Sequence, residues 1–292
     1  VDRRQRQMCI RDRGNTSYMN ILFGLMNPRD LFYSNVEGSK FEANKNYVKD
    51  YKVEDKDGKQ VVTLTFTDQA KFNDGTEIDW TALQTAYICL SGQNEAFEVS
   101  STDGYDKIES VEQGDNAKTA VITMKEPVYP VEQVLGYALH PKLQDPEFFN
   151  KGYNSEPNND LGAGPYIVDS FDDTQATFKP NPKWWGDAPK LDTLIFKQMD
   201  TQAQINAFKN GEVDTMGATS MNGSAEVLSN FNSMADAQVR RGLGNSIAVI
   251  EINSTRGVLQ DIAVRKAFCQ VVDAPTIVSI VFQGVNWKED AP

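Results

Sequence analysis

Stretches with the periodicity of β-strands alternate with stretches that have the periodicity of α-helices, and this alternation restricts the fold more than any other feature of the chain. Residues 60–67 place apolar side chains on one face and threonines on the other, which is typical of a half-buried strand. Residues 79–90 carry one apolar stripe between a capping aspartate, Asp79, and a terminating glycine, Gly92, which predicts a helix. Further strands are expected at 107–111, 118–124, 166–171, 175–179, 191–198 and 247–252, and further helices at 131–140, 201–209, 261–272 and 275–282. Strands interspersed with helices predict an α/β protein.

Composition excludes several classes of protein. The chain has 292 residues, of which 40% are hydrophobic and 24% charged, as expected for an ordered protein with one large domain or two modest ones. No window approaches the 18 or so consecutive apolar residues that a transmembrane helix needs. The net charge of -12 opposes binding to a phosphate backbone, so nucleic acid is not expected as a partner.

The first 13 residues differ in composition from the rest, because they hold five of the ten arginines. They lack the apolar spacing of a membrane-binding helix and resemble translated adapter sequence, so we interpret residues 1–13 as a non-native arm. Without this arm two cysteines remain, Cys89 and Cys269, both within apolar helical patterns. We expect two buried thiols, and a disulfide between them is the alternative.

The sequence offers little for catalysis. His140 is the only histidine, and its place before a proline at a helix end favours an interaction with the helix dipole. The glycine-rich stretch at 162–164 is followed by Pro165, which has no amide hydrogen for a phosphate, and Asp55 and Asp57 fit a solvated hairpin tip better than a calcium loop. We therefore expect no catalytic residue, no metal and no cofactor. A pair of carboxylates for glycoside hydrolysis stays open, because sequence spacing defines no distance between acids.

Aromatic residues are numerous for a chain with so little catalytic equipment. Each one alone is typical of a core or loop anchor. As a set they are consistent with a cleft that covers a polar small molecule. The set comprises Tyr18, Phe32, Tyr33, Trp80, Trp184, Trp185 and Trp287.

Four motifs, in a fixed order over residues 70–273, resemble a known family. They are the turn AKFNDGT at 70–76 before a helix, GAGPY at 162–166 with FKPNPKWW at 178–185, AFKNGEVD at 207–214, and VRKAF at 264–268 spaced between Asn253, Asp261 and Asp273. The chain resembles the extracytoplasmic solute-binding proteins of ABC importers, in the dipeptide- and oligopeptide-binding class known as family 5.

The resemblance implies an α/β fold of the two-lobed, type II periplasmic-binding-protein kind, with an extra subdomain in the first lobe and an incomplete second lobe. Residues 14–29 and 156–245 are then expected to form the first lobe, residues 30–155 its additional subdomain, and residues 246–292 the start of the second lobe. Family members are longer, so we expect the sequence to be truncated at both ends.

The resemblance also implies a function. The protein is expected to capture peptides or similar small solutes by hinge closure and to deliver them unchanged to an ABC permease in the membrane. It is expected to be a monomer and extracytoplasmic, in the periplasm or as a cell-surface lipoprotein attached through an upstream cysteine. The candidate ligand-binding residues are Tyr18, Asn20, Phe32, Tyr33, Asn253 and Thr255.

Two alternatives from other classes remain open at this point. An extracellular hydrolase acting on a polymer would turn its substrate over and would hold two carboxylates facing one cleft. A sensory or adhesive protein that kept the fold would have no permease gene beside its own.

Overall fold

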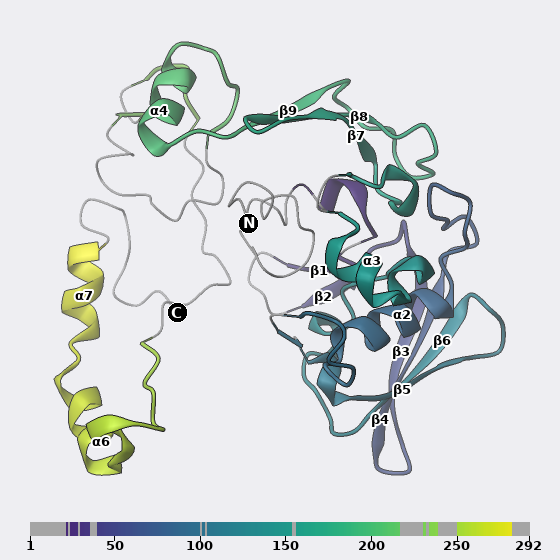
Figure 1. Ribbon diagram of the computed structural model, residues 1–292, viewed down its shortest axis with the longest axis horizontal. Helices are drawn as coiled ribbons and strands as arrows, with labels where there is room; N and C mark the ends of the chain where they lie inside the picture. Colours follow the sequence, from purple (N-terminus) through teal and green to yellow (C-terminus); the bar gives the residue numbers. More distant parts are fainter. Residues whose placement is uncertain are drawn as a thin grey trace. The chain divides into compact units, whose positions relative to one another are not determined.

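The computed structural model describes residues 22, 24–28, 30–35, 40–99, 101–102, 104–153, 156–216, 230–231, 234–238 and 250–281 (Figure 1). The chain divides into two compact units, Val1–Gln198 and Met199–Pro292, which are described separately below. The lobe and subdomain boundaries expected from the sequence stay a prediction.

A four-stranded antiparallel sheet in the order β3-β4-β6-β5 forms the centre of the first unit. Its strands are β3 (Val48–Lys56), β4 (Lys59–Phe66), β5 (Ile108–Gln113) and β6 (Thr119–Met124). Val62, Leu64 and Phe66 are fully buried, which confirms the alternation expected in β4. Asp57 and Gly58 join β3 to β4 with φ angles of 54° and 81°, so they form a two-residue hairpin turn of the primed type.

Helix α2 (Trp80–Leu90) covers the sheet and confirms the predicted helix. The Asp79 carboxylate accepts a hydrogen bond of 2.9 Å from the Thr81 amide and so caps the first turn. The stripe of Ala82, Leu83 and Ala86 is buried where α2 packs against β5 and β6, and Figure 1 shows the helix lying over the sheet. The core of the unit is therefore built as the apolar pattern predicts.

The helix expected at 131–140 is wrong. Only the 3₁₀ turn η3 (Val131–Gln133) forms there. The backbone beyond it bonds to distant segments, since the Leu139 amide donates to the Ala82 carbonyl and the Gly136 carbonyl accepts from the Leu31 amide. These long-range bonds replace the helical ones and still bury Leu135. The 3₁₀ turn η2 (Tyr105–Lys107) adds Tyr105 to the main core. A second apolar cluster includes residues of η4 (Pro141–Gln144), α3 (Pro146–Lys151) and η5 (Asn159–Leu161).

Two smaller sheets complete the first unit. Strands β1 (Phe32–Ser34) and β2 (Phe41–Ala43) form an antiparallel pair. The other sheet has the order β7-β8-β9, with β7 (Tyr166–Phe171), β8 (Gln175–Pro180) and β9 (Leu194–Lys197). The strands expected at 166–171, 175–179 and 191–198 are confirmed.

The second unit is helical over its described residues. Helices α4 (Thr201–Lys209), α6 (Ile262–Val271) and α7 (Ala274–Val281) confirm three sequence expectations, and η6 (Gly257–Gln260) precedes α6. Asp200 and Asp261 cap α4 and α6 through their carboxylates. None of the described helices is long and apolar enough to cross a membrane.

Two expectations in the second unit are wrong. Residues 250–252 form no strand and Ile250 is 57% exposed, while 247–249 lie outside the described residues. Cys89 is buried as expected, but Cys269 is exposed, because α6 buries none of its side chains. An apolar run or stripe indicates which residues are suited to burial, and burial also needs a partner surface.

Candidate functional site

Strand β1 carries two of the predicted ligand-binding residues on opposite faces. Phe32 pairs with Ala43 and Tyr33 with Glu42 in the ladder with β2. Successive side chains of a strand point in opposite directions. Phe32 is buried edge-on against the Tyr51 ring at 4.8 Å, whereas Tyr33 is 51% exposed. Of these two residues, Tyr33 is therefore the one that presents its side chain to solvent.

The Tyr33 hydroxyl is held by a buried asparagine. Asn44 donates from its side-chain amide to the Tyr33 hydroxyl at 2.7 Å and to the Asp30 carbonyl at 3.2 Å. Burial first, and then the charge of Asp30, raise the pKa of Tyr33 above its ordinary value. The phenol stays neutral, and because its oxygen accepts from Asn44, the hydroxyl hydrogen is left to be donated elsewhere. The arrangement offers an oriented O–H donor to a ligand oxygen.

Asn44 and Asp30 were not singled out from the sequence. Asn44 is fixed because its amide donates to the Leu31 carbonyl and its side-chain oxygen accepts from the Asn46 amide. Asp30 adopts a positive φ of 59°, a conformation that aspartate tolerates better than most residues. The only local signal was the position of both residues next to the short strands.

The predicted loop-anchoring role of Trp184 and Trp185 is confirmed. The Trp185 indole nitrogen donates to the Asn46 carbonyl at 2.8 Å. Both rings contact Tyr47, with centroid separations of 5.9 Å and 5.6 Å. The buried Tyr47 hydroxyl donates to the Ala163 carbonyl at 2.9 Å, and burial raises the pKa of this phenol. These aromatic side chains are therefore tied to the first unit.

The glycines at 162–164 permit two backbone segments to cross. The amides of Ala163 and Gly164 both donate to the Met26 carbonyl at 2.8 Å. A Cβ atom on Gly164 would lie 2.2 Å from the Leu25 carbonyl oxygen, and one on Gly162 would lie 2.5 Å from the Met26 carbonyl oxygen. The close approach of the two backbones explains why glycine stands at positions 162 and 164.

The turn at 72–75 is joined to this crossing by buried asparagines. The Asn73 amide donates to the Gly162 carbonyl at 2.8 Å, and its side-chain nitrogen donates to the Asn159 carbonyl at 2.8 Å. Asn181 donates from its side chain to Asn73 Oδ1 at 2.9 Å and to the Gly164 carbonyl at 2.7 Å. Lys183 donates to the Asn73 carbonyl.

The remaining candidate residues have local roles or lie outside the described residues. Asn253 and Thr255 are exposed in the second unit, where Asn253 Oδ1 accepts from the Thr255 amide at 3.0 Å and from its hydroxyl at 2.7 Å. Tyr18 and Asn20 lie outside the described residues. Ligand contact by all six candidates stays a prediction.

His140 lies at the start of η4, where Nδ1 accepts from the Lys142 amide at 3.1 Å, so it caps a short 3₁₀ helix. Within the described ranges, no group of three or more His, Cys, Asp or Glu side chains is placed to hold a metal ion.

Comparison with known proteins assigns the family. The model of the bacterial extracellular solute-binding proteins, family 5, middle region, matches residues 41–292. The chain belongs to this family. It is 30% identical over 234 residues to the oligopeptide-binding protein OppA of Mycobacterium tuberculosis and of Mycobacterium bovis. The match covers 78% of this chain and 39% of each OppA, so the chain spans about two fifths of these curated relatives.

Solved structures with a similar fold indicate the architecture of the chain. The periplasmic EDTA-binding protein EppA superposes with a TM-score of 0.73 at 24% identity, over 94% of this chain and 53% of EppA. MoaA of A. tumefaciens R10, solved with mannopinic acid, superposes with a TM-score of 0.65 at 21% identity, over 91% of this chain and 53% of MoaA. The fold of this family 5 protein is of the two-lobed, type II periplasmic-binding-protein kind, as expected from the motifs.

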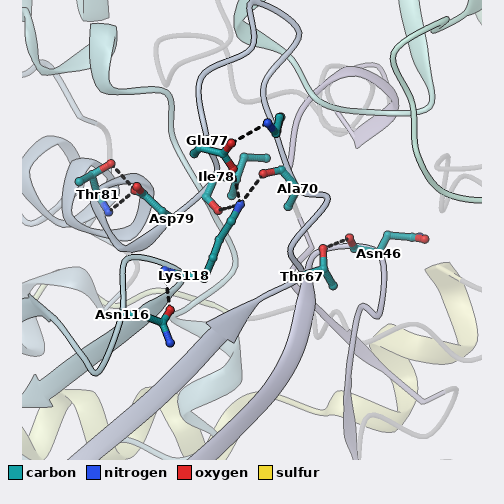
Figure 2. Close-up of polar contacts among 10 residues, drawn as sticks. Asn46, Thr67, Ala70, Glu77, Ile78, Asp79, Thr81, Asn116 and Lys118 are labelled. Atoms are coloured by element: carbon teal, nitrogen blue, oxygen red, sulfur yellow. Dashed lines mark hydrogen bonds and ion pairs between the residues drawn. The ribbon is translucent and has the colours of Figure 1, made fainter.

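The turn of the first family motif is held by Lys118, a lysine that lies outside the motif and was not predicted from the sequence. Lys118 of this family 5 protein donates to the carbonyl oxygens of Ala70 at 2.8 Å and Ile78 at 3.1 Å, and pairs with Glu77 at 2.7 Å (Figure 2). Lys71 pairs with the other oxygen of the same carboxylate at 2.7 Å. Hydrogen bonds from Lys118 and then Lys71 hold the pKa of Glu77 below its ordinary value. The ammonium of Lys118 therefore closes the turn at its base.

Replacing Lys118 with methionine is expected to destabilise the protein by about 1–3 kcal/mol, because the Ile78 carbonyl loses the ammonium donor, the Ala70 carbonyl keeps only the Ile78 amide, and Glu77 loses a partner. The Lys118 side chain is only 18% exposed. Lys71→Met is the matched control, since the Lys71 side chain is 51% exposed and its ion pair contributes about 1 kcal/mol or less. Urea unfolding of both variants measures the difference. Equal losses would contradict the closing role of Lys118.

Proposed function

We propose that this protein is the substrate-binding component of an ABC importer and captures peptides or similar small solutes outside the cytoplasm. The observation that carries the proposal is the family 5 match over residues 41–292, together with 30% identity to an oligopeptide-binding protein. The relatives are binding proteins, so the ligand is released unchanged. The partner is a membrane permease that receives the ligand, and the protein works as a monomer held at the cell surface or in the periplasm.

Hinge closure is the mechanism that we propose for capture. A ligand that contacts both lobes stabilises the closed state in proportion to its preference for that state over the open one. In the first unit, Tyr33 donates its hydroxyl hydrogen to a carbonyl or carboxylate oxygen of the ligand, oriented by Asn44. In the second unit, Asn253 and Thr255 are exposed and offer polar groups.

Peptide is the ligand class proposed, because the 30% identical relatives are named for oligopeptides. The similar folds of EppA and MoaA are described with EDTA and mannopinic acid, so the fold alone does not select peptides. These two ligands are therefore the appropriate competitors in a binding experiment.

Binding of a peptide to the complete protein is expected to raise its unfolding temperature. A ligand at 100 times its dissociation constant contributes about 2.7 kcal/mol, which corresponds to a rise of roughly 2–5 °C in a protein of this size or larger. A series of peptides of increasing length is compared with metal-loaded EDTA and with mannopinic acid. Mass spectrometry of the peptide after incubation tests for turnover. If a competitor raises the unfolding temperature and no peptide does, the peptide assignment is wrong. If the peptide is cleaved, the protein is not a simple binding protein.

Replacing Tyr33 with phenylalanine is expected to weaken peptide binding by about two- to tenfold, because one hydrogen bond to the ligand is lost. Tyr129→Phe is the control, since Tyr129 is 81% exposed and the sequence analysis did not select it as a ligand contact. Calorimetric titration of both variants measures the dissociation constants. Unchanged affinity of the Tyr33→Phe protein would remove Tyr33 from the site without affecting the family assignment.

A further inference from the structure

His140 is the only histidine of the chain, and its ring is buried between two turns. On one side Nδ1 accepts from the Lys142 amide at 3.1 Å. On the other side Nε2 lies 3.0 Å from Asp74 Oδ2 and 3.3 Å from the Thr76 hydroxyl. The Phe72 ring contacts the imidazole with its centroid 4.8 Å away. One ring nitrogen thus contacts the neighbouring residue Lys142, and the other contacts the turn at 72–76, which is distant in sequence.

These contacts select one state of the ring. A backbone amide can only donate, so Nδ1 must keep its lone pair toward Lys142. The hydrogen of the neutral ring then lies on Nε2, where it is donated to the Asp74 carboxylate. A protonated ring would carry a second hydrogen on Nδ1, directed at the Lys142 amide hydrogen, and that hydrogen bond would be lost. The site is therefore built for the neutral imidazole with its hydrogen on Nε2.

The charges around the ring partly oppose one another. Burial is the largest influence and lowers the pKa of His140, the charge of Asp74 raises it, and the charge of Lys142 lowers it, with a net decrease from 6.5. Two further residues with ionisable side chains, Asp160 and Lys183, form hydrogen bonds with the backbone of the same turn. The Asp160 carbonyl accepts from the Asp74 amide, and the Lys183 ammonium donates to the Asn73 carbonyl.

Asp74 connects the ring to the backbone crossing. Its carboxylate accepts from the Thr76 amide at 2.8 Å, and its own amide donates to the Asp160 carbonyl at 2.9 Å. The neighbouring Asn73 amide donates to Gly162. A change at His140 therefore reaches residues 159–162 through the turn at 72–76.

We propose that His140 is an acid-sensitive latch: its neutral ring ties the turn at 72–76 to η4, and its protonation loosens that turn and the bonds it makes to residues 159–162. Among residues 1–292, no other histidine contributes to a response in this pH range.

The direction of the pH dependence follows from linkage. The pKa of His140 is lower in the folded protein than its ordinary 6.5, so in the interval between the two values the unfolded chain binds more protons. Stability is highest above pH 6.5 and falls as the pH is lowered toward the folded pKa. Although its partial burial opposes this, hydrogen bonds from Thr76 and the interaction with His140 hold the pKa of Asp74 below 3.8. The stability that Asp74 contributes is therefore lost only when the pH falls below 3.8, toward the lowered pKa of this carboxyl.

The His140 ring signal, assigned by its absence from the spectrum of the His140→Asn variant, makes the proposal directly measurable by NMR. It is expected to titrate with a midpoint below 6.5, and the ring nitrogen shifts to identify the Nε2–H form at neutral pH. Between pH 6.5 and the lower pKa of folded His140, the equilibrium constant for unfolding is expected to rise by up to about tenfold for each unit by which the pH is lowered. The exchange of the Asn73 and Asp74 amides with deuterium, corrected for the intrinsic rate, is expected to accelerate as the ring is protonated.

His140→Asn is the control variant, because its side-chain oxygen can still cap the Lys142 amide but does not titrate. Its stability is expected to be flat between pH 7.5 and 5. A midpoint at or above 6.5, an Nδ1–H ring, unaltered exchange on protonation, or the same pH dependence in the variant would overturn the latch. If the variant fails to fold, the titration of the unaltered protein decides.

Discussion

Replacing Gly164 with alanine is expected to destabilise the protein by about 2–4 kcal/mol, because the added methyl group has no space. Its Cβ atom would lie 2.2 Å from the Leu25 carbonyl oxygen and 2.7 Å from the Met26 carbonyl carbon. Both neighbours are backbone atoms, so rotation of a side chain cannot relieve the contact. The two crossing segments must separate, and the bonds from Ala163 and Gly164 to the Met26 carbonyl lengthen as they do.

Gly136→Ala is the matched control for this substitution. The atom nearest to its added Cβ is the Gln133 carbonyl oxygen at 4.0 Å, an ordinary contact distance, and its φ lies outside the left-handed region. We expect this variant to stay within about 1 kcal/mol of the parent. Urea unfolding followed by tryptophan fluorescence compares the two. Equal stability of both variants would contradict the close crossing at residues 162–164.

Local signals in the sequence predicted those elements whose causes are local. The capping aspartates Asp79, Asp200 and Asp261 stand directly before the helices that they cap. The Asp57-Gly58 pair forms the tip of a two-residue hairpin, because aspartate and glycine tolerate positive φ. Such features need only a few neighbouring residues, which a pattern contains.

The failures have a common physical cause. The residues at 131–140 have an apolar pattern suited to a helix, but their backbone groups bond to Pro28, Leu31 and Ala82, and those partners are invisible to periodicity. The exposed Cys269 lies on a helix whose position was predicted correctly, but burial of its apolar side chains needs a covering surface that periodicity does not reveal. Arg265 stands four residues after Asp261, a spacing that favours an ion pair on a helix, yet its guanidinium donates to the Leu259 and Gln260 carbonyls, while Asp261 caps the helix.

The candidate site was only partly accessible to sequence reasoning. Phe32 and Tyr33 are adjacent in a strand, and alternation implies that their side chains point to opposite faces. Which one does so depends on Tyr51, against which Phe32 packs. Asn44 could not be identified, because its importance comes from orienting a hydroxyl eleven residues away in sequence. The family motifs were recognisable because they are scaffold, and scaffold residues are not the ones that select a ligand.

Replacing Asn73 with alanine is expected to cost about 2–4 kcal/mol, because its side chain joins three segments inside the protein. The Asn159 carbonyl would keep only the Gly162 amide as a donor, and the Asn181 amide would lose one of its two acceptors. Asn73 and Asn181 are 5% exposed, so water does not readily replace these bonds. Asn116→Ala is the control, since Asn116 is exposed and its side chain bonds only within its own turn, to Lys118 and Thr119, which limits the expected loss to about 1 kcal/mol.

A double-mutant cycle separates the bond between the two asparagines from their other roles. Asn181→Ala alone removes the donors to Asn73 and Gly164, so it is destabilising by itself. If the two side chains act through their mutual bond, the double variant loses less stability than the sum of the single ones, with a coupling of about 0.5–3 kcal/mol. Additive losses would mean that the turn at 72–75 and the loop at 181–183 are anchored independently. The crossing at 162–164 would then have two separate supports, and the turn that contacts His140 through Asp74 could loosen without disturbing Asn181.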